Sequence, residues 1–192
     1  MSKYIIFDVE TTGLPKNRYS HPKNYDNWPY IVQISWIIVN DNKKTEKSFI
    51  IKPNKYTIPE DSIKIHKITN EIANKQGVLI KSVLEDFNKD CKEVNFILAH
   101  NMEFDKNVVL ASFYRNNINT KTLKEKKTLC TMKSTTKLCK LPGKYGYKYP
   151  RLEELYFFLF KKKPSVVLHN SLEDARITLE CYEELLNYKV FT

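Results

Sequence analysis

The apolar run near the N-terminus restricts the fold of this chain more than any other feature of its sequence. Residues Lys3–Val9 are mostly β-branched or aromatic, which predicts a buried strand. Two carboxylates, Asp8 and Glu10, stand at the end of this strand with one residue between them. Side chains two residues apart share a face of a strand, so the two acids are expected to project together, with Cα atoms roughly 6.5 Å apart. Like charges that close repel each other unless a cation joins them, although two acids at a solvent-facing strand end also fit the pattern.

Strands alternate with helices along the rest of the sequence. Ile31–Val39 and Lys47–Lys52 are predicted to pair as a hairpin across the polar turn VNDNKK, and further strands are predicted at Phe96–Ala99 and near Thr128–Thr131. Apolar residues at helical spacing predict helices in five segments: short pieces within 60–73, then 78–93, 101–115, 151–160 and 171–186. Pro15–Pro29 is predicted to be a surface excursion, and a basic loop with glycines is expected after residue 131. This order indicates an α/β fold with a mixed sheet, and 192 residues fit a single domain spanning residues 1–192.

The charge of the chain points toward a polyanionic partner. The formal net charge is +10, a balance that favours nucleic acid over an acidic small molecule. Lysine greatly outnumbers arginine and asparagine is abundant, so an AT-rich genome would produce the same bias without any selection for binding. Charge by itself leaves both interpretations open.

The cysteines and the apolar runs predict an intracellular protein. Cys91, Cys130, Cys139 and Cys181 show no C-x-x-C spacing, so neither a zinc site nor a disulfide framework is indicated and reduced thiols are expected. The sequence shows no leader peptide and no apolar run long enough to cross a bilayer. A cytoplasmic or nuclear protein, not a secreted one, is therefore expected.

A second group of polar residues follows the strand predicted at Phe96–Ala99. His100 and Asn101 stand at the end of that strand, and Asp105 lies in the first turn of the next helix. Helical side chains lean toward the N-terminus of their helix, so Asp105 is expected to reach the same edge of the sheet as Asp8. The alternative is an acid on the helix surface with no further role.

A third group opens the last predicted helix. His169 stands five residues before Asp174, and Asn170 is a plausible N-cap with Glu173 as its reciprocal partner. That arrangement leaves Asp174 free to face the sheet. A cap formed by Ser171 with Asp174 is the competing possibility, and a lone histidine at such a place is more often a satisfied polar residue than a catalyst.

The three groups together resemble the motifs of the DEDDh exonucleases, the DnaQ-like 3′–5′ exonuclease family of the ribonuclease H-like superfamily. The matching elements are Asp8-x-Glu10, then H-N-x-x-F-D ending at Asp105, then His169 five residues before Asp174. The stretches ETTGL, IVQISWIIV and IHKIT also agree with the family, with Lys67 where relatives often have a glycine after His66. The resemblance implies a five-stranded mixed sheet flanked by helices on both faces.

The resemblance also implies two-metal hydrolysis of nucleic acid. Two Mg²⁺ or Mn²⁺ ions would be held by four acids: Asp8, Glu10, Asp105 and Asp174. His169 would act as the general base, a task that suits an imidazole near neutral pH. The expected reaction releases nucleoside 5′-monophosphates from the 3′ end of DNA or RNA, with DNA slightly favoured.

Several residues are expected beside the terminal nucleotide of the substrate. They are Thr11, Thr12, Leu14, His66 and Asn101. Lysines and tyrosines alternate in the basic segment 137–151, where they would contact phosphates and bases or else form a solvated connector.

Three other functions fit parts of this pattern. The chain could be an RNA-trimming exoribonuclease, a non-catalytic nucleic-acid-binding or polymerase-associated subunit, or a metallohydrolase of small phosphoesters. A polymerase or a second copy of the chain is a possible partner.

Overall fold

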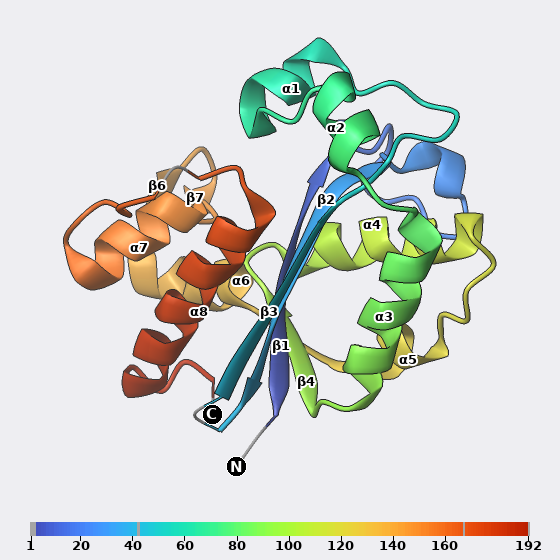
Figure 1. Cartoon of the computed structure of the whole chain (residues 1–192). Coiled ribbons are helices and arrows are strands. Elements are labelled where there is room, and N and C mark those ends of the chain that lie inside the picture. Colours follow the sequence, from blue (N-terminus) through green and yellow to red (C-terminus); the bar gives the residue numbers. More distant parts are fainter. Residues whose placement is uncertain (1–2, 42, 167, 192) are drawn as a thin grey trace.

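Five strands form a mixed, twisted sheet in the centre of the molecule (Figure 1). The computed structural model of the chain describes residues 3–41, 43–166 and 168–191. The strands are β1 (Tyr4–Thr11), β2 (Ile31–Asn40), β3 (Lys43–Ile50), β4 (Phe96–Ala99) and β5 (Lys127–Cys130). Their order is β3-β2-β1-β4-β5; β2 is antiparallel to both β1 and β3, whereas β4 is parallel to β1 and β5. The predicted ribonuclease H-like architecture is confirmed.

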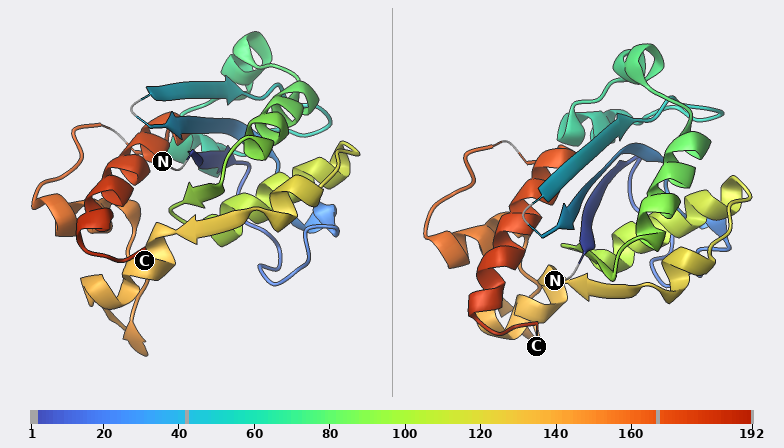
Figure 2. Two further views of the ribbon diagram at one scale, coloured as in Figure 1. Left: turned by 90° about the horizontal axis from the view of Figure 1, so that it is seen from below. Right: turned by 60° about the horizontal axis from the view of Figure 1, so that its bottom comes forward.

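Helices cover both faces of this sheet, as Figure 2 shows from two further directions. They are α1 (Glu60–His66), α2 (Asn70–Gln76), α3 (Ile80–Lys92), α4 (Met102–Arg115), α5 (Lys121–Glu125), α6 (Thr131–Cys139), α7 (Leu152–Phe160) and α8 (Ser171–Asn187). Helices α3, α4 and α5 lie on one side of the sheet and α6, α7 and α8 on the other, while α1 and α2 lie beyond the end at which β1 finishes (Figure 1). No helix in the described part of the chain is long and apolar enough to cross a membrane.

The alternation of side chains along β1 decides which face receives the acids. Ile5, Phe7 and Val9 belong to the core between the sheet and helices α3 and α4. Tyr4 and Ile6 pack with residues of α8 on the opposite face. Because alternate residues share a face, Asp8 and Glu10 continue the row that begins at Tyr4 and point to the α8 side.

Strand β3 is longer at its start than the sequence predicts. It was expected over Lys47–Lys52, but it runs over Lys43–Ile50 and pairs with β2 as far as Asn40 opposite Lys43. The turn therefore centres on Asp41, and Asn42 lies outside the described residues. Lysine and glutamate dominate the first half of β3 because it is an edge strand whose side chains are mostly exposed, and this polarity hid the strand from a search for apolar alternation.

Two helices were missed around the predicted strand near Thr128–Thr131. The strand β5 ends at Cys130, and the threonine-rich segment that follows forms α6 instead of leading directly into a loop. The hydroxyl of Thr135 donates to the carbonyl of Thr131 at 2.7 Å, and Cys130 caps the helix. Threonine has a low helix propensity, so these local bonds and packing override the sequence preference. The short helix α5, which precedes β5, was also missed. Beyond α6, the two-residue strands β6 (Pro142–Gly143) and β7 (Gly146–Tyr147) form a small hairpin in the basic segment.

The surface excursion Pro15–Pro29 is held firmly against α4. It contains a short 3-10 helix, η1 (Tyr25–Asn27), and the side chain of Trp28 is only 3% exposed. Arg115 at the end of α4 donates to the carbonyl of Pro29 at 3.0 Å and to the carbonyls of Tyr25 and Trp28. These bonds replace regular secondary structure in satisfying the backbone of the excursion.

Candidate active site

Strand β1 carries the first two acids to the end of the sheet, where its pairing with β2 becomes irregular. Glu10 lies opposite Gln33, whereas Thr11 lies opposite Ile31, so Val32 is an extra residue on β2. Such bulges bend a strand and are frequent beside functional sites, because they redirect side chains locally. Glu10 is only 9% exposed at this position.

The third acid reaches the site from the first turn of α4. Two residues separate the end of β4 from the start of this helix, and β4 is the parallel neighbour of β1. Asp105 is 3% exposed, and its backbone amide donates to the carbonyl of Asn101 at 3.2 Å. Glu103, two residues earlier, instead forms an ion pair with Lys133 at 2.5 Å near the surface. The short turn between β4 and α4 thus places one acid inward and the other outward.

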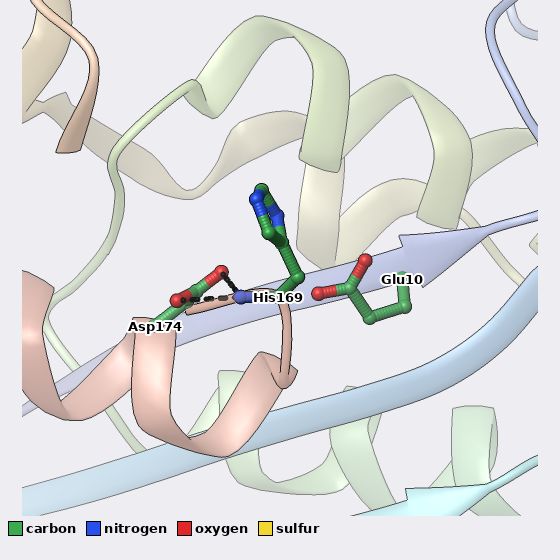
Figure 3. Close-up of side chains that lie close together, drawn as sticks. All are labelled: Glu10, His169 and Asp174. Carbon is green, nitrogen blue, oxygen red and sulfur yellow. Dashed lines mark hydrogen bonds between the residues drawn. The ribbon is translucent and has the colours of Figure 1, made fainter. Parts of the chain in front are cut away.

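The fourth acid and the histidine come from the start of α8 (Figure 3). The backbone amide of His169 donates to both carboxylate oxygens of Asp174, at 3.3 and 3.2 Å. One ligand atom each from Glu10, His169 and Asp174 all lie within 4.8 Å of one another. His169 has a positive φ of 73°, a sharp change of chain direction that brings its imidazole, which is exposed, over the acids. We call Asp8, Glu10, Asp105 and Asp174 the acid cluster.

The capping of α8 differs in part from the sequence prediction. Asn170 caps the helix as expected, since its side-chain oxygen accepts from the amides of Leu172 and Glu173 at 3.1 and 3.4 Å. The reciprocal role predicted for Glu173 is wrong, because its carboxylate pairs with Arg176 at 2.6 Å. The competing cap by Ser171 with Asp174 is wrong as well, because Asp174 binds the amide of His169.

Burial and mutual repulsion raise the pKa values throughout the acid cluster. Burial, followed by the charges of Asp105 and Asp174, raises the pKa of Asp8 well above its usual range. Burial and the same two neighbours raise the pKa of Glu10 to about 8. Burial also raises the pKa of Asp105 to about 8 and that of Asp174 to about 6, although backbone hydrogen bonds act in the opposite direction on both.

These shifts provide a test of whether the residues fit a metal ion. The charge of Asp174 raises the pKa values of Asp8, Glu10 and Asp105, which is expected when the four carboxyls face a common space. Buried carboxylates that repel one another are stabilised by a hard divalent cation, and carboxylate oxygens are the ligands that Mg²⁺ and Mn²⁺ prefer. The donor set therefore fits such ions.

One protein family and several solved structures match this chain. The sequence model of the RNase_T family, described as "Exonuclease", matches residues 5–182. The chain belongs to the DEDDh exonuclease family. This family uses divalent metal ions, in agreement with the donor set of the acid cluster. No curated protein sequence matches the chain.

Solved structures of Exonuclease I share the fold of this DEDDh family member. Apo Exonuclease I gives a TM-score of 0.74 at 18% identity, covering 100% of this chain and 44% of that chain. E. coli Exonuclease I in complex with a dA16 oligonucleotide gives 0.74 at 18% identity, covering 100% and 42%. A moderately thermophilic Exonuclease I from Methylocaldum szegediense gives 0.74 at 17% identity, covering 100% and 42%. The chain thus spans less than half the length of these Exonuclease I chains.

A buried polar network fixes the start of α8 against the sheet, and the sequence prediction missed it. The amide of Ser171 donates to the side-chain oxygen of Gln33 at 3.1 Å, and the hydroxyls of Ser171 and Ser35 lie 2.7 Å apart. All three residues are at most 5% exposed. Gln33 and Ser35 alternate in an otherwise apolar strand, opposite Glu10 and Asp8. That polar alternation within IVQISWIIV was the available signal.

The turn after β1 presents the residues expected beside a nucleotide. Thr12 donates its amide to the carbonyl of Tyr30 and accepts the amide of Tyr30 on its hydroxyl oxygen, both at 3.0 Å, so its hydroxyl hydrogen can still be donated. The hydroxyl of Thr11 donates to the carbonyl of Gly13 at 2.7 Å. Gly13 has a φ of 138°, which favours glycine, and Leu14 beyond it is 83% exposed. An apolar side chain held in solvent beside the acids is available to contact a ligand.

His66 and Asn101 lie at the rim of the same site. His66 is 6% exposed, and its Nδ1 accepts the amide of Ile68 at 3.1 Å, so Nε2 carries the hydrogen. Among the described residues Nε2 has no partner at normal hydrogen-bond geometry, although the backbone of Thr11 lies close enough to raise the pKa of the ring. Burial lowers the pKa of His66, and His169 nearby lowers it further, which keeps the ring neutral. Lys67 has a φ of 63°, the left-handed conformation that favours glycine at the end of a helix. The side chain of Asn101 does not cap α4 and borders the cavity that contains His169 and Asp174.

Proposed function

We propose that the chain is a 3′–5′ exonuclease that releases nucleoside 5′-monophosphates from the 3′ end of DNA or RNA, with DNA slightly favoured. The observation that carries this proposal is the convergence of the acid cluster beneath His169, from three elements of a DEDDh fold: β1, α4 and α8. The Exonuclease I structures bound to oligonucleotides support a single-stranded substrate. A polymerase partner or a second copy of the chain stays a prediction.

The acid cluster would hold two Mg²⁺ or Mn²⁺ ions. When bound, such ions lower the pKa of water for attack on a phosphodiester and stabilise the negative charge of the departing oxygen. The protein supplies the fixed positions of the carboxylates, since Glu10 and Asp105 are held by the sheet and by the first turn of α4. Neighbouring acids raise the pKa values of Asp8 and Glu10 by repulsion between their charges, and a bound cation would relieve this repulsion.

His169 would accept the proton of the attacking water. Its backbone is anchored to Asp174, while its exposed ring has a nitrogen within 4.8 Å of ligand oxygens of Glu10 and Asp174. An imidazole at this place can take a proton and release it to solvent without adding negative charge to the cluster.

The turn of β1 and two side chains would position the terminal nucleotide. Leu14 would contact the base, and the free hydroxyl hydrogen of Thr12 would be donated to the sugar or phosphate. Thr11 would contribute its backbone. His66 offers the unpaired Nε2 hydrogen as a neutral donor, and Asn101 offers its amide from the start of α4.

The deciding experiment follows 5′-labelled oligonucleotides of DNA and RNA, single-stranded and paired, in the presence of Mg²⁺ or Mn²⁺. The proposal expects ladders that shorten stepwise from the 3′ end, 5′-monophosphate products, and no activity in the Asp8→Ala and Asp174→Ala variants with unchanged circular dichroism. His169→Ala should slow turnover and leave metal binding largely intact.

The same assay separates the other candidate functions. Faster shortening of RNA than DNA would identify an exoribonuclease. Binding without shortening would identify a non-catalytic subunit, and activity confined to small phosphoesters would identify a different metallohydrolase. Retained hydrolysis in either aspartate variant would contradict the assignment of the acid cluster.

A further inference from the structure

Two adjoining cavities lie near the acid cluster; Asp174 lines the first, and none of the four acids lines the second. The first, about 700 Å³ in volume, contains His169 and Asp174. The second, about 720 Å³ and here called the outer groove, is bordered on one side by residues 14–19 of the surface excursion. Asn101, Met132 and Tyr149 line both cavities. The two cavities therefore adjoin at these three residues, with Asp174 in the first and Arg18 in the second.

The outer groove has the chemistry of a surface for an unpaired nucleic acid strand. Lys16, Arg18 and Lys133 line it, and its only carboxylate, that of Glu103, is already paired with Lys133 at 2.5 Å. Cationic side chains along a groove contact phosphates, and the net charge of +10 adds long-range attraction for a polyanion.

Two exposed tyrosines add flat surfaces to these charges. Tyr19 is 76% exposed and Tyr149 is 56% exposed, although both line the same groove. The guanidinium of Arg18 lies 4.7 Å from the centre of the Tyr19 ring. A hydrogen bond with the Tyr19 hydroxyl raises the pKa of Arg18, and the charges of Glu103 and Tyr149 raise it by smaller amounts. Aromatic rings that are open to solvent stack on bases only where the bases are unpaired.

The wall that carries Arg18 and Tyr19 is held in place before any ligand binds. Asn27 accepts the amide of Asn17 at 2.8 Å and donates to its carbonyl at 2.9 Å, closing the excursion on itself. Arg115 ties the far end of the excursion to α4. A binding surface that is already ordered loses less entropy when it captures a flexible strand.

We propose that the outer groove binds the nucleotides that precede the terminal one in a single strand. Tyr19 and Tyr149 stack on their bases, and Arg18 and Lys133 contact their phosphates. Leu14, which also lines the groove, marks its boundary with the terminal nucleotide. This inference rests on the proposed exonuclease function and adds that the enzyme requires several unpaired nucleotides for full activity.

The test compares two substrates that differ in what reaches the outer groove. One is the p-nitrophenyl ester of thymidine 5′-monophosphate, which offers a single nucleotide to the acids. The other is a 5′-labelled 12-mer, as single-stranded DNA or RNA and as a blunt duplex. The variants are Tyr19→Ala and Arg18→Ala, with Tyr188→Ala and Lys89→Ala as controls, because Tyr188 and Lys89 are exposed and do not line the groove.

The expected result is a ratio of kcat/KM for the single-stranded 12-mer to that for the ester that falls about tenfold in Tyr19→Ala and Arg18→Ala, mainly through KM. The two controls should keep the wild-type ratio, and the blunt duplex should be degraded more slowly than the single strand. An unchanged ratio in both groove variants, or a duplex degraded as fast as the single strand, would overturn the inference. A wild-type protein that hydrolyses neither substrate would instead overturn the proposed function.

Discussion

Two groups of carboxylates lie on opposite faces of the same sheet, and they are neutralised in different ways. On the α3 face, Lys47 binds Asp86 at 2.8 Å and Asp90 at 2.7 Å, and the indole of Trp36 donates to Asp90 at 2.8 Å. Burial lowers the pKa of Lys47, but its hydrogen bonds with the two aspartates outweigh burial, so the pKa is raised. This group, which we call the lysine cluster, contains its own cation.

No lysine or arginine within residues 3–41, 43–166 and 168–191 forms an ion pair with the acid cluster on the α8 face. Arg176 of α8 pairs with Glu46 and Glu173 and not with Asp174. Burial raises the pKa values of all four carboxyls, and the charges of other acids in the cluster raise those of Asp8, Glu10 and Asp105 further. The difference teaches that buried acids brought together without a lysine or arginine form a site for a cation from solution, whereas acids with a built-in lysine form a structural contact.

The largest expected effect separates the two clusters by activity. Asp105→Asn keeps the shape of the side chain and removes a metal-binding charge, so hydrolysis of a labelled 12-mer should fall at least about 10³-fold. Asp86→Asn in the lysine cluster should retain the wild-type rate within about twofold. Rates are compared on gels, with circular dichroism as a folding control. An Asp105→Asn protein that keeps more than a tenth of the wild-type rate would remove the distinction.

The reverse substitution should affect stability and not chemistry. Lys47→Met leaves Asp86 and Asp90 side by side without their cation, which should lower the free energy of unfolding by about 2 kcal/mol, since the pair is only partly exposed. Urea denaturation measures this loss, and the 12-mer assay serves as the control. A Lys47→Met protein with reduced hydrolysis but unchanged stability would show that the lysine cluster is not structural.

The network beneath α8 should have a smaller effect on catalysis. Gln33→Ala removes the acceptor of the Ser171 amide, so the start of α8 and with it Asp174 should shift relative to β1. We expect kcat on the 12-mer to fall about tenfold and Mn²⁺ to bind more weakly. If Gln33→Ala loses stability while kcat and Mn²⁺ affinity are unchanged, the network has no positioning role.

The stability of the metal-free protein should depend on pH through the acid cluster. Unfolded carboxyls titrate near pH 4, whereas the pKa values of Glu10 and Asp105 are raised to about 8. Between these values the folded protein binds more protons than the unfolded chain, so stability falls as pH rises. Burial lowers the pKa of His66 and lowers that of His100 to about 4, which opposes the trend below about pH 6.5.

The comparison is therefore made between pH 6.5 and 8.5 with EDTA present. The free energy of unfolding, measured by urea denaturation, should decrease over this range by on the order of 1 kcal/mol per pH unit for each of the two acids. The Glu10→Gln/Asp105→Asn double variant should show a flatter profile. Identical profiles for the two proteins would mean that the acid cluster is not strained in the absence of metal.

The sequence predicts the acid cluster better than the surroundings that hold it. Asp8 and Glu10 follow from the two-residue alternation of a buried strand, and Asp105 follows from the direction in which helical side chains lean. The mixed five-stranded sheet follows from the hairpin and from the resemblance to DEDDh exonucleases. These inferences rely on local geometry, which a sequence specifies strongly, and the roles of these residues stay predictions until they are tested.

The features that were missed depend on distant partners or on local competition. The bond between Gln33 and Ser171 joins residues 138 positions apart, so no local pattern announces it. Glu173 pairs with Arg176 instead of completing the cap, because a charged partner lies one turn away. The first half of β3 is lysine-rich because an edge strand tolerates exposed charge, and α6 forms despite its threonines because packing outweighs propensity.

Calorimetric titration of the metal-free protein with Mn²⁺ tests the central claim most directly. The wild type should bind two ions per chain at pH 7.5 and release protons as they bind, because the pKa values of the acid cluster are raised. Asp86→Asn should bind them equally well, and Asp8→Asn should bind fewer or none. A wild-type protein that binds no Mn²⁺, or an Asp8→Asn protein that binds it as tightly as the wild type, would contradict the account.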